Sequence, residues 1–236
     1  MKLSIVIPTL NEEKYIHHLL QGIQNQTLQP YEVIVIDCGS EDRTQAIVKS
    51  FHNVKLVIAD KPVGNQRTRG GELAKGDMIL FLDADVRLDS HFIKASLQEM
   101  AQRKLSVACP LYIPYPGSYT INLFYKFFNA LFKFSEKTLP SGAGSGIFVS
   151  KKIFDACGGF DSSLTFDDIK FIRTAGKIGS FGMLHTSIKV SDRRIRMYGL
   201  VRIIIIYLFL SISFLFGLYR LTNYAPYAFG MFRRSK

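Results

Sequence analysis

The sequence predicts an α/β fold with a mixed, mostly parallel central sheet. Short apolar runs rich in β-branched residues alternate with segments whose apolar residues recur at helical spacing, and short turns join them. This alternation is typical of a parallel sheet with helices on both faces. An apolar run at 78–82 ends in Asp83 and Asp85, as expected of a buried strand that carries polar groups to its carboxyl end.

Length and composition limit the organisation and the partners. The 236 residues are enough for one large α/β domain with an appendage. A net charge of +11 suits a nucleic acid, a phosphorylated substrate or an anionic membrane. The basic residues form no nucleic-acid motif, so we expect no nucleic-acid partner. Three scattered cysteines without CxxC spacing are typical of reduced thiols in the cytosol.

The first half of the chain is expected to supply four strands and three helices. Pro8 stops the first strand, Thr9 or Asn11 can cap the helix that follows, and Gly39 permits a tight turn after the second strand. The expected strands lie at 3–8, 32–37, 54–59 and 78–82, and the expected helices at 12–26, 40–51 and 63–75.

The second half is expected to alternate in the same way. Helices are predicted at 88–102, 120–137 and 167–177, and strands at 105–112 and 180–184. The helix at 120–137 is aromatic on one side and carries lysines elsewhere, which predicts either a membrane interface or lipid-like acceptor contact, or a core helix. The glycine-rich segment at 139–150 is interpreted as a loop that approaches a ligand or is simply flexible.

Asp83 and Asp85 are candidate metal ligands. Residues i and i+2 of an extended segment point the same way, so the two carboxylates repel each other unless a cation lies between them. Mg²⁺ is commonly held by one or two carboxylates together with substrate phosphates. A solvated acid-rich turn is the alternative interpretation.

Asp37 and Arg67 are candidates for nucleotide contact. Asp37 ends the second strand, where acids of nucleotide-binding folds accept hydrogen bonds from a base or ribose. Capping of the next helix is its alternative role. Arg67 can meet a phosphate, or it can lie on a solvated helix face.

The motifs at 4–13, 33–44 and 76–85 together resemble those of family 2 glycosyltransferases of the GT-A fold, in order as well as in spacing. The resemblance covers about residues 1–195, and Cys38 departs from it where the family often has a second Asp. It implies transfer of a sugar from a UDP- or GDP-linked donor to a lipid or glycan acceptor, by an inverting single displacement that uses Mn²⁺ or Mg²⁺. It implies that the donor is held by Pro8, Thr9, Asn11, Glu12, Asp37, Arg67 and Asp83.

The segment from 158–161 to Asp167 and Asp168 resembles the family's Gly-Gly-Phe-Asp motif and the acid pair that follows it. This resemblance implies that Asp168 is the general base for the acceptor hydroxyl and that Asp167 replaces the usual glutamate. The alternative is that both acids stabilise a helix N-terminus through its dipole.

Three late residues are further candidates. By analogy with related enzymes, His185 would complete the metal site with Asp83 and Asp85. Arg193 and Arg194 would hold the leaving diphosphate, or they would flank a membrane segment.

Residues 1–195 are therefore predicted to form the GT-A domain, and 196–236 a C-terminal transmembrane or membrane-interfacial segment. The apolar run at 200–218, about 19 residues, is near the minimum length that spans a bilayer. The protein is expected to associate with a membrane through this C-terminal helix, with its catalytic domain in the cytoplasm. Two other functions stay open: a nucleotidyltransferase, whose glycine-rich basic signature is absent after the first strand, and a non-catalytic membrane scaffold.

Overall fold

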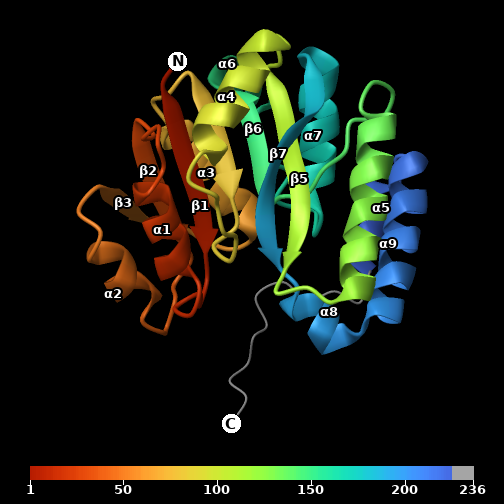
Figure 1. The fold of residues 1–236 in the computed structure, drawn as a ribbon, viewed down its shortest axis with the longest axis horizontal. Helices are drawn as coiled ribbons and strands as arrows, with labels where there is room; N and C mark the ends of the chain where they lie inside the picture. The colour runs from red at the N-terminus through yellow and green to blue at the C-terminus, as the bar shows by residue number, and fades with distance from the viewer. Residues whose placement is uncertain (225–236) are drawn as a thin grey trace.

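A seven-stranded sheet in the order β3-β2-β1-β4-β6-β5-β7 forms the centre of the computed structural model, which describes residues 1–224 (Figure 1). The strands are β1 (Leu3–Thr9), β2 (Glu32–Asp37), β3 (Val54–Ile58), β4 (Met78–Leu82), β5 (Val107–Tyr115), β6 (Gly146–Ser150) and β7 (Phe181–Ser191). Only β6 runs antiparallel to its neighbours among these described strands. The prediction of a mixed, mostly parallel sheet is confirmed.

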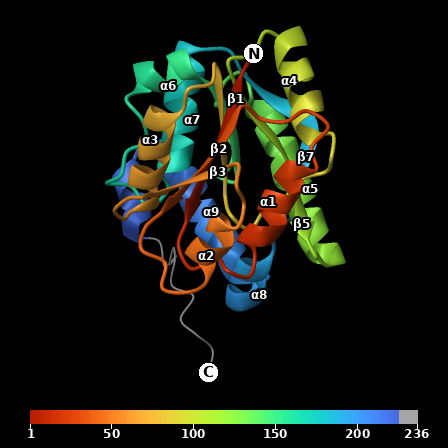
Figure 2. The same cartoon turned by 90° about the vertical axis from the view of Figure 1, so that its left-hand side faces the viewer.

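Helices cover both faces of the sheet, as its buried strands require. Figure 2 shows α3, α6 and α7 on one side and α1 and α4 on the other. The helices are α1 (Ile16–Gln24), α2 (Thr44–Lys49), α3 (Val63–Leu73), α4 (Phe92–Gln102), α5 (Tyr119–Ser135), α6 (Lys151–Cys157), α7 (Asp167–Ile178), α8 (Arg193–Tyr198) and α9 (Leu200–Leu215), with a 3₁₀ helix, η1 (Tyr219–Tyr224).

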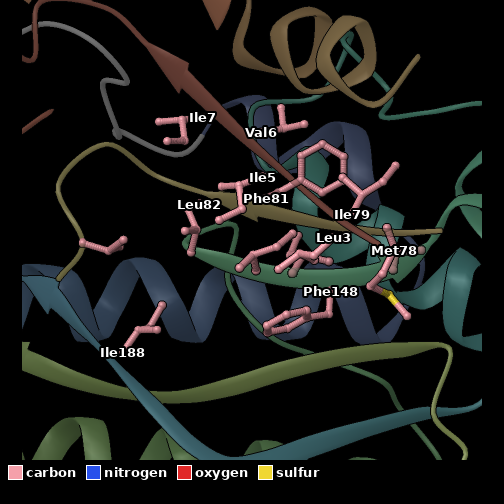
Figure 3. Packing of buried hydrophobic residues seen from close by; sticks show 14 of the residues in the cluster. Leu3, Ile5, Val6, Ile7, Met78, Ile79, Phe81, Leu82, Phe148 and Ile188 are labelled. Carbon is pink, nitrogen blue, oxygen red and sulfur yellow. The ribbon is translucent and has the colours of Figure 1, made fainter. Parts of the chain in front are cut away.

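The core lies around β1, β4 and β6. Every residue of β1 and β4 is buried, because helices cover the sheet on both sides. Figure 3 shows the packed side chains, with Ile5 of β1, Phe81 of β4 and Phe148 of β6 among them. This packing makes the middle of the sheet rigid, so the loops that follow β1 and β4 start from well-defined positions.

The sequence patterns did not predict β6, α6, α8 or η1. The segment at 139–150 was interpreted as a loop, but its last five residues form β6, inserted antiparallel between β4 and β5. Ser150 then caps α6 by accepting a hydrogen bond from the Ile153 N–H at 3.3 Å. The apolar run at 147–149 indicates a strand, but the glycines before it favour a loop, so the strand is not recognised from the sequence.

A C-terminal helix that could span a membrane, one of the two expected forms of this segment, is not present within residues 1–224, and the membrane-interfacial form stays a prediction. The apolar run at 200–218 forms α9, which has 16 residues and ends before Gly217, where φ is +71°. The Leu218 N–H donates to the Ser213 carbonyl at 2.8 Å, as in a Schellman C-cap. No helix in the described part of the chain is both long enough and apolar enough to cross a membrane.

Candidate functional site

The site lies where β1, β2 and β4 end at the same edge of the sheet. β1 is central to this group, since β2 pairs with it on one side and β4 on the other, all three in parallel. Thr9 is in register with Asp37, and Asp83 directly follows β4. The carboxyl ends of parallel strands are where open α/β sheets bind ligands.

Asp37 organises the turn that follows β2. Its Oδ1 accepts hydrogen bonds from the backbone N–H groups of Gly39 and Ser40, at 3.1 and 2.9 Å, and from Gln45 Nε2 at 2.8 Å. Its Oδ2 accepts from the hydroxyls of Ser40 and Thr9. Asp37 thus builds the turn after β2 and does not cap α2, which begins at Thr44, and its contact with a nucleoside stays a prediction.

The segment after β1 is tied to the segment after β2. The Asn11 N–H donates to Ser40 Oγ at 2.8 Å, and Asn11 Oδ1 accepts from the Glu41 N–H at 2.9 Å. The Glu12 N–H donates to Thr44 Oγ1 at 2.8 Å. These bonds bring the two predicted nucleoside-binding segments together, and Pro8 and Thr9 lie buried in the strand just before them.

Arg193 contacts both Glu12 and Asp85, which are far from it in the sequence. Its two terminal nitrogens donate to both carboxylate oxygens of Glu12 at 3.0 and 2.7 Å, and its Nε lies 3.2 Å from Asp85 Oδ2. The guanidinium also lies over the Tyr15 ring, 4.7 Å from its centroid. Burial raises the pKa of Glu12 and of Asp85, and the Arg193 charge opposes both shifts.

Arg67 neutralises two other acids. It donates to Asp167 Oδ1 at 2.8 Å and to Asp83 Oδ1 at 3.1 Å, and its side chain is almost wholly buried. Ser145 Oγ donates to the second oxygen of Asp83 at 3.0 Å. The guanidinium is therefore engaged by carboxylates in this structure, and the predicted contact of Arg67 with a phosphate stays a prediction.

Asp168 lies beside this cluster in the first turn of α7. Its Oδ2 accepts from the Gly144 N–H at 2.7 Å and its Oδ1 from the Ile169 N–H at 2.8 Å. Both Asp167 and Asp168 are in the first helical turn, so the helix dipole favours them whatever else they do. Removal from bulk water raises the pKa of both carboxyls, and the Arg67 charge opposes the shift.

These acids open into one cavity of about 430 Å³. Its polar end is lined by Arg67, Asp83, Asp85, Asp167, Asp168 and Arg194, together with the segment at 141–145. Its other end is lined by apolar and aromatic residues of α5 and α9. The cavity is within the range of about 300–1,000 Å³ that is usual for small-molecule sites.

The polar end suits a divalent cation that a phosphorylated ligand helps to hold. Within residues 1–224, no group of three or more His, Cys, Asp or Glu side chains is placed to hold a metal ion by itself. Asp83 and Asp85 bring two carboxylates to the cavity, the usual protein share at a magnesium–diphosphate site, and a bound cation would replace the contacts that Arg67 and Arg193 make with them in this structure. The residues present therefore fit Mg²⁺ or Mn²⁺ when diphosphate oxygens complete the coordination.

His185 is not placed with Asp83 and Asp85. Its Nδ1 lies 2.8 Å from Glu99 Oε1 and its Nε2 lies 3.1 Å from Lys133 Nζ. It does not line the cavity that holds the two aspartates. β7 continues well past the predicted strand end at 184, so His185 lies within the strand rather than at its end. The predicted ligand role for His185 has no geometric support.

Ser145 and Gly144 are site residues that the sequence did not predict individually, although they lie in the segment at 139–150 that is expected to approach a ligand. Each makes one of the hydrogen bonds to Asp83 or Asp168 described above. The only local signal was the run of small residues at 141–146, which permits close backbone approach but does not say to what. Their partners lie 62 and 24 residues away in the chain.

Replacing Gly144 with Ala is expected to destabilise the protein by about 1–3 kcal/mol, the usual cost of overpacking. An added Cβ would lie 2.3 Å from Arg67 Nη2 and 3.0 Å from Asp168 Oδ2. Gly22→Ala is the matched control, since its Cβ would meet nothing closer than 3.9 Å inside α1 and should stabilise the helix. Urea denaturation midpoints measure the stability of both variants. Equal midpoints for Gly144→Ala and Gly22→Ala would show that the site is loosely packed.

Comparison with known proteins identifies the family. The model of the family described as "Glycosyl transferase family 2" matches residues 4–158. An O-antigen chain rhamnosyltransferase of Salmonella typhimurium is 30% identical over 134 residues, which are 55% of this chain and 43% of that protein. A GalNAc(5)-diNAcBac-PP-undecaprenol beta-1,3-glucosyltransferase of Campylobacter jejuni is 30% identical over 106 residues, 42% of this chain and 34% of that protein. The chain thus spans less than half the length of these relatives.

Solved structures show the same fold. Staphylococcus aureus TarS 1-349 in complex with UDP-GlcNAc superposes with a TM-score of 0.68 at 22% identity, covering 81% of this chain and 58% of that one. The mannosyltransferase PcManGT from Pyrobaculum calidifontis, in complex with GDP-Man and Mn²⁺, superposes with a TM-score of 0.66 at 17% identity, covering 80% and 56%. With the family model matched over most of its length, this chain belongs to glycosyl transferase family 2.

Proposed function

We propose that the protein transfers a sugar from a nucleotide-sugar to an acceptor hydroxyl or phosphate, with inversion at the anomeric carbon. The observation that supports this proposal best is that Asp83, Asp85 and Asp168 line one cavity although they come from two separate motifs. Such a cavity has room for a diphosphate at one pair of acids and for an acceptor at the third. A non-catalytic scaffold would not require this arrangement.

The donor is proposed to bind at the ends of β1, β2 and β4. The segments at 9–12 and 37–44, which hydrogen bonds tie together, would hold the nucleoside. Bound Mg²⁺ or Mn²⁺, held by Asp83 and Asp85, would neutralise the diphosphate and so make it a better leaving group. Arg194 lines the cavity beside these acids and would also neutralise the negative charge of the diphosphate.

Asp168 is proposed to take the acceptor proton. As the acceptor oxygen forms its bond to the anomeric carbon, the bond from that carbon to the diphosphate oxygen breaks, and the proton passes to Asp168 Oδ. The Gly144 N–H and the Ile169 N–H fix the carboxylate orientation. Asp167, held by Arg67, would position this end of α7 rather than react.

The acceptor is proposed to be linked to a lipid. The far end of the cavity is apolar, with Phe124, Phe128, Tyr207 and Leu210 among its lining residues. An isoprenoid or acyl chain fits such walls better than a glycan alone. The name of the Campylobacter jejuni relative includes an undecaprenol diphosphate, which is a lipid-linked group of this chemical class. The three free thiols support a cytoplasmic position for the catalytic domain.

Thermal shift with UDP, GDP and CMP, each with and without Mn²⁺, tests the donor site. We expect one nucleotide to raise the melting temperature, and to do so only when Mn²⁺ is present. The Asp85→Asn variant should lose this shift, whereas Asp77→Asn, at the other end of β4, should keep it. A protein that no nucleotide stabilises under any of these conditions would instead favour the scaffold.

A further inference from the structure

We propose that α5 and α9 together form a docking face for an anionic lipid bilayer, and that the helices lie in the interface without crossing it. We define this α5–α9 face by nine exposed apolar side chains. They are Leu123, Phe127, Leu131 and Phe134 on α5, and Val201, Ile205, Leu208, Ile212 and Leu215 on α9.

The α5 half of the face is a stripe with helical spacing. Leu123, Phe127, Leu131 and Phe134 are separated by four, four and three residues, so they share one side of the helix. Phe127 is 63% exposed and Phe134 is 90% exposed. Exposed phenylalanines repeated along one side of a helix are costly in water and favour contact with an apolar phase.

The α9 half repeats this pattern. Val201, Ile205, Leu208, Ile212 and Leu215 are separated by four, three, four and three residues, and all are exposed. The opposite side of α9 is buried against the domain, where Arg173 of α7 donates to the Phe214 carbonyl at 2.5 Å. The helix is therefore attached to the domain by one side and presents the other outward.

The two stripes belong to one surface. Phe124 and Phe128 of α5 both contact Tyr207 of α9, with ring centroids 5.8 and 5.5 Å apart. Figure 1 shows α5 and α9 next to each other at one edge of the molecule. Contiguous exposed apolar patches of this kind are rare on monomeric soluble proteins and mark interaction or membrane sites.

The charge around the face selects an anionic bilayer. Neither helix contains an acid, and residues 193–236 contain none either. Lys126 on α5 and Arg202 on α9 are exposed, and Arg196 and Arg220 flank α9. The same face of a second copy carries the same positive charge, whereas anionic headgroups attract these cations. Long basic side chains can also reach the headgroups while their stems lie along apolar surface.

The cavity reaches the same face. Leu131, Ile212 and Leu215 belong to the α5–α9 face and also line the cavity whose polar end holds Asp168. A lipid-linked acceptor could then bring its head group to Asp168 while its chain stays between apolar walls. This part of the inference depends on the proposed function, whereas binding of the face to a bilayer does not.

Sedimentation of the full chain with vesicles tests the docking face. The probes are vesicles of phosphatidylcholine alone and of phosphatidylcholine mixed with phosphatidylglycerol. Wild-type protein should sediment with the mixed vesicles, less so at high salt, and least with phosphatidylcholine alone. Leu123→Glu and Leu208→Glu, at positions 58% and 57% exposed, should each weaken partitioning at least about tenfold, because a charge replaces an inserted apolar side chain.

Leu28→Glu is the matched control, since Leu28 is 42% exposed between α1 and β2 and should leave vesicle binding unchanged. All three variants should keep the nucleotide-dependent thermal shift of wild type, which separates lost docking from lost folding or a failed donor site. Wild-type protein that binds no vesicle, or a dimer that Leu208→Glu dissociates, would overturn the proposal. Resistance to alkaline carbonate extraction would also overturn it, because an interfacial protein is released.

Discussion

Asp168→Asn is expected to lower kcat/KM by about 10²–10⁴-fold, the usual contribution of a general base. Asparagine has nearly the same shape, and its single side-chain oxygen can still accept one of the two bonds that Asp168 now accepts, from the Gly144 N–H at 2.7 Å or the Ile169 N–H at 2.8 Å. It has no carboxylate to take a proton, so turnover should fall while the donor site stays formed. Initial rates with donor and acceptor measure the loss, and the nucleotide-dependent thermal shift measures donor binding.

Asp155→Asn is the control for this substitution. Asp155 lies on α6, pairs with Lys151 at 2.7 Å and does not line the cavity, so its loss should leave turnover unchanged. If Asp168→Asn retained the wild-type rate, Asp168 would not be the base. If it lost the thermal shift as well, its main role would be to build the donor site.

The pH dependence of kcat/KM is a second test of Asp168 as the general base. Removal from water raises the pKa of Asp168 above the ordinary carboxyl value. A base must be deprotonated, so activity should be lost as the pH falls through this raised pKa, at a higher pH than an exposed aspartate would give. The profile of kcat/KM reports the free enzyme, so a limb at the ordinary carboxyl pKa would contradict the assignment.

Arg67→Met is expected to lower the free energy of unfolding by about 3–5 kcal/mol, the cost of removing one partner from a buried ion pair. Asp167, which is only 1% exposed, would then stay buried without its cation and close to the partly exposed Asp83. Urea denaturation at neutral pH measures the loss. The loss should shrink as the pH falls through the raised pKa of Asp167, because a protonated carboxyl needs no cation.

Arg69→Met provides the matched control on the same helix. Arg69 pairs with Glu72 at 3.3 Å, both side chains are about half exposed, and the change should cost less than about 1 kcal/mol. Adding Asp167→Asn to Arg67→Met should restore part of the lost stability, because the two side chains interact directly. Equal midpoints for the two arginine variants would show that Arg67 does not stabilise the acid cluster.

Much of the fold was predictable because its signals are local. The runs that form β1, β2 and β4 are short, apolar and bounded by turn residues, and each strand appears where its pattern predicts it. The site was predictable in outline for a similar reason, since acids that directly follow parallel strands meet at one sheet edge. β6 was missed because five residues after a glycine-rich run carry too little periodicity to be recognised.

The errors concern residues whose role depends on distant partners. His185 was expected at the metal site, but β7 runs past it and its ring contacts Glu99, 86 residues away. The run at 200–218 has the composition of a spanning segment, but Gly217 ends α9 and the helix packs against α5 and α7. Neither sheet order nor the packing partner of a helix is encoded in a local pattern.

Sequence alone determined the alternation of strands and helices, the family motifs and the acids at the strand ends, because each depends on residues close together in the chain. Tertiary structure decided which charges meet. Arg67 pairs with an acid 100 residues away, and Arg193 with one 181 residues away. Such pairs form only after the order of strands in the sheet has brought the segments together. Burial then makes such partners important, since a carboxylate removed from water needs a cation or several hydrogen-bond donors beside it.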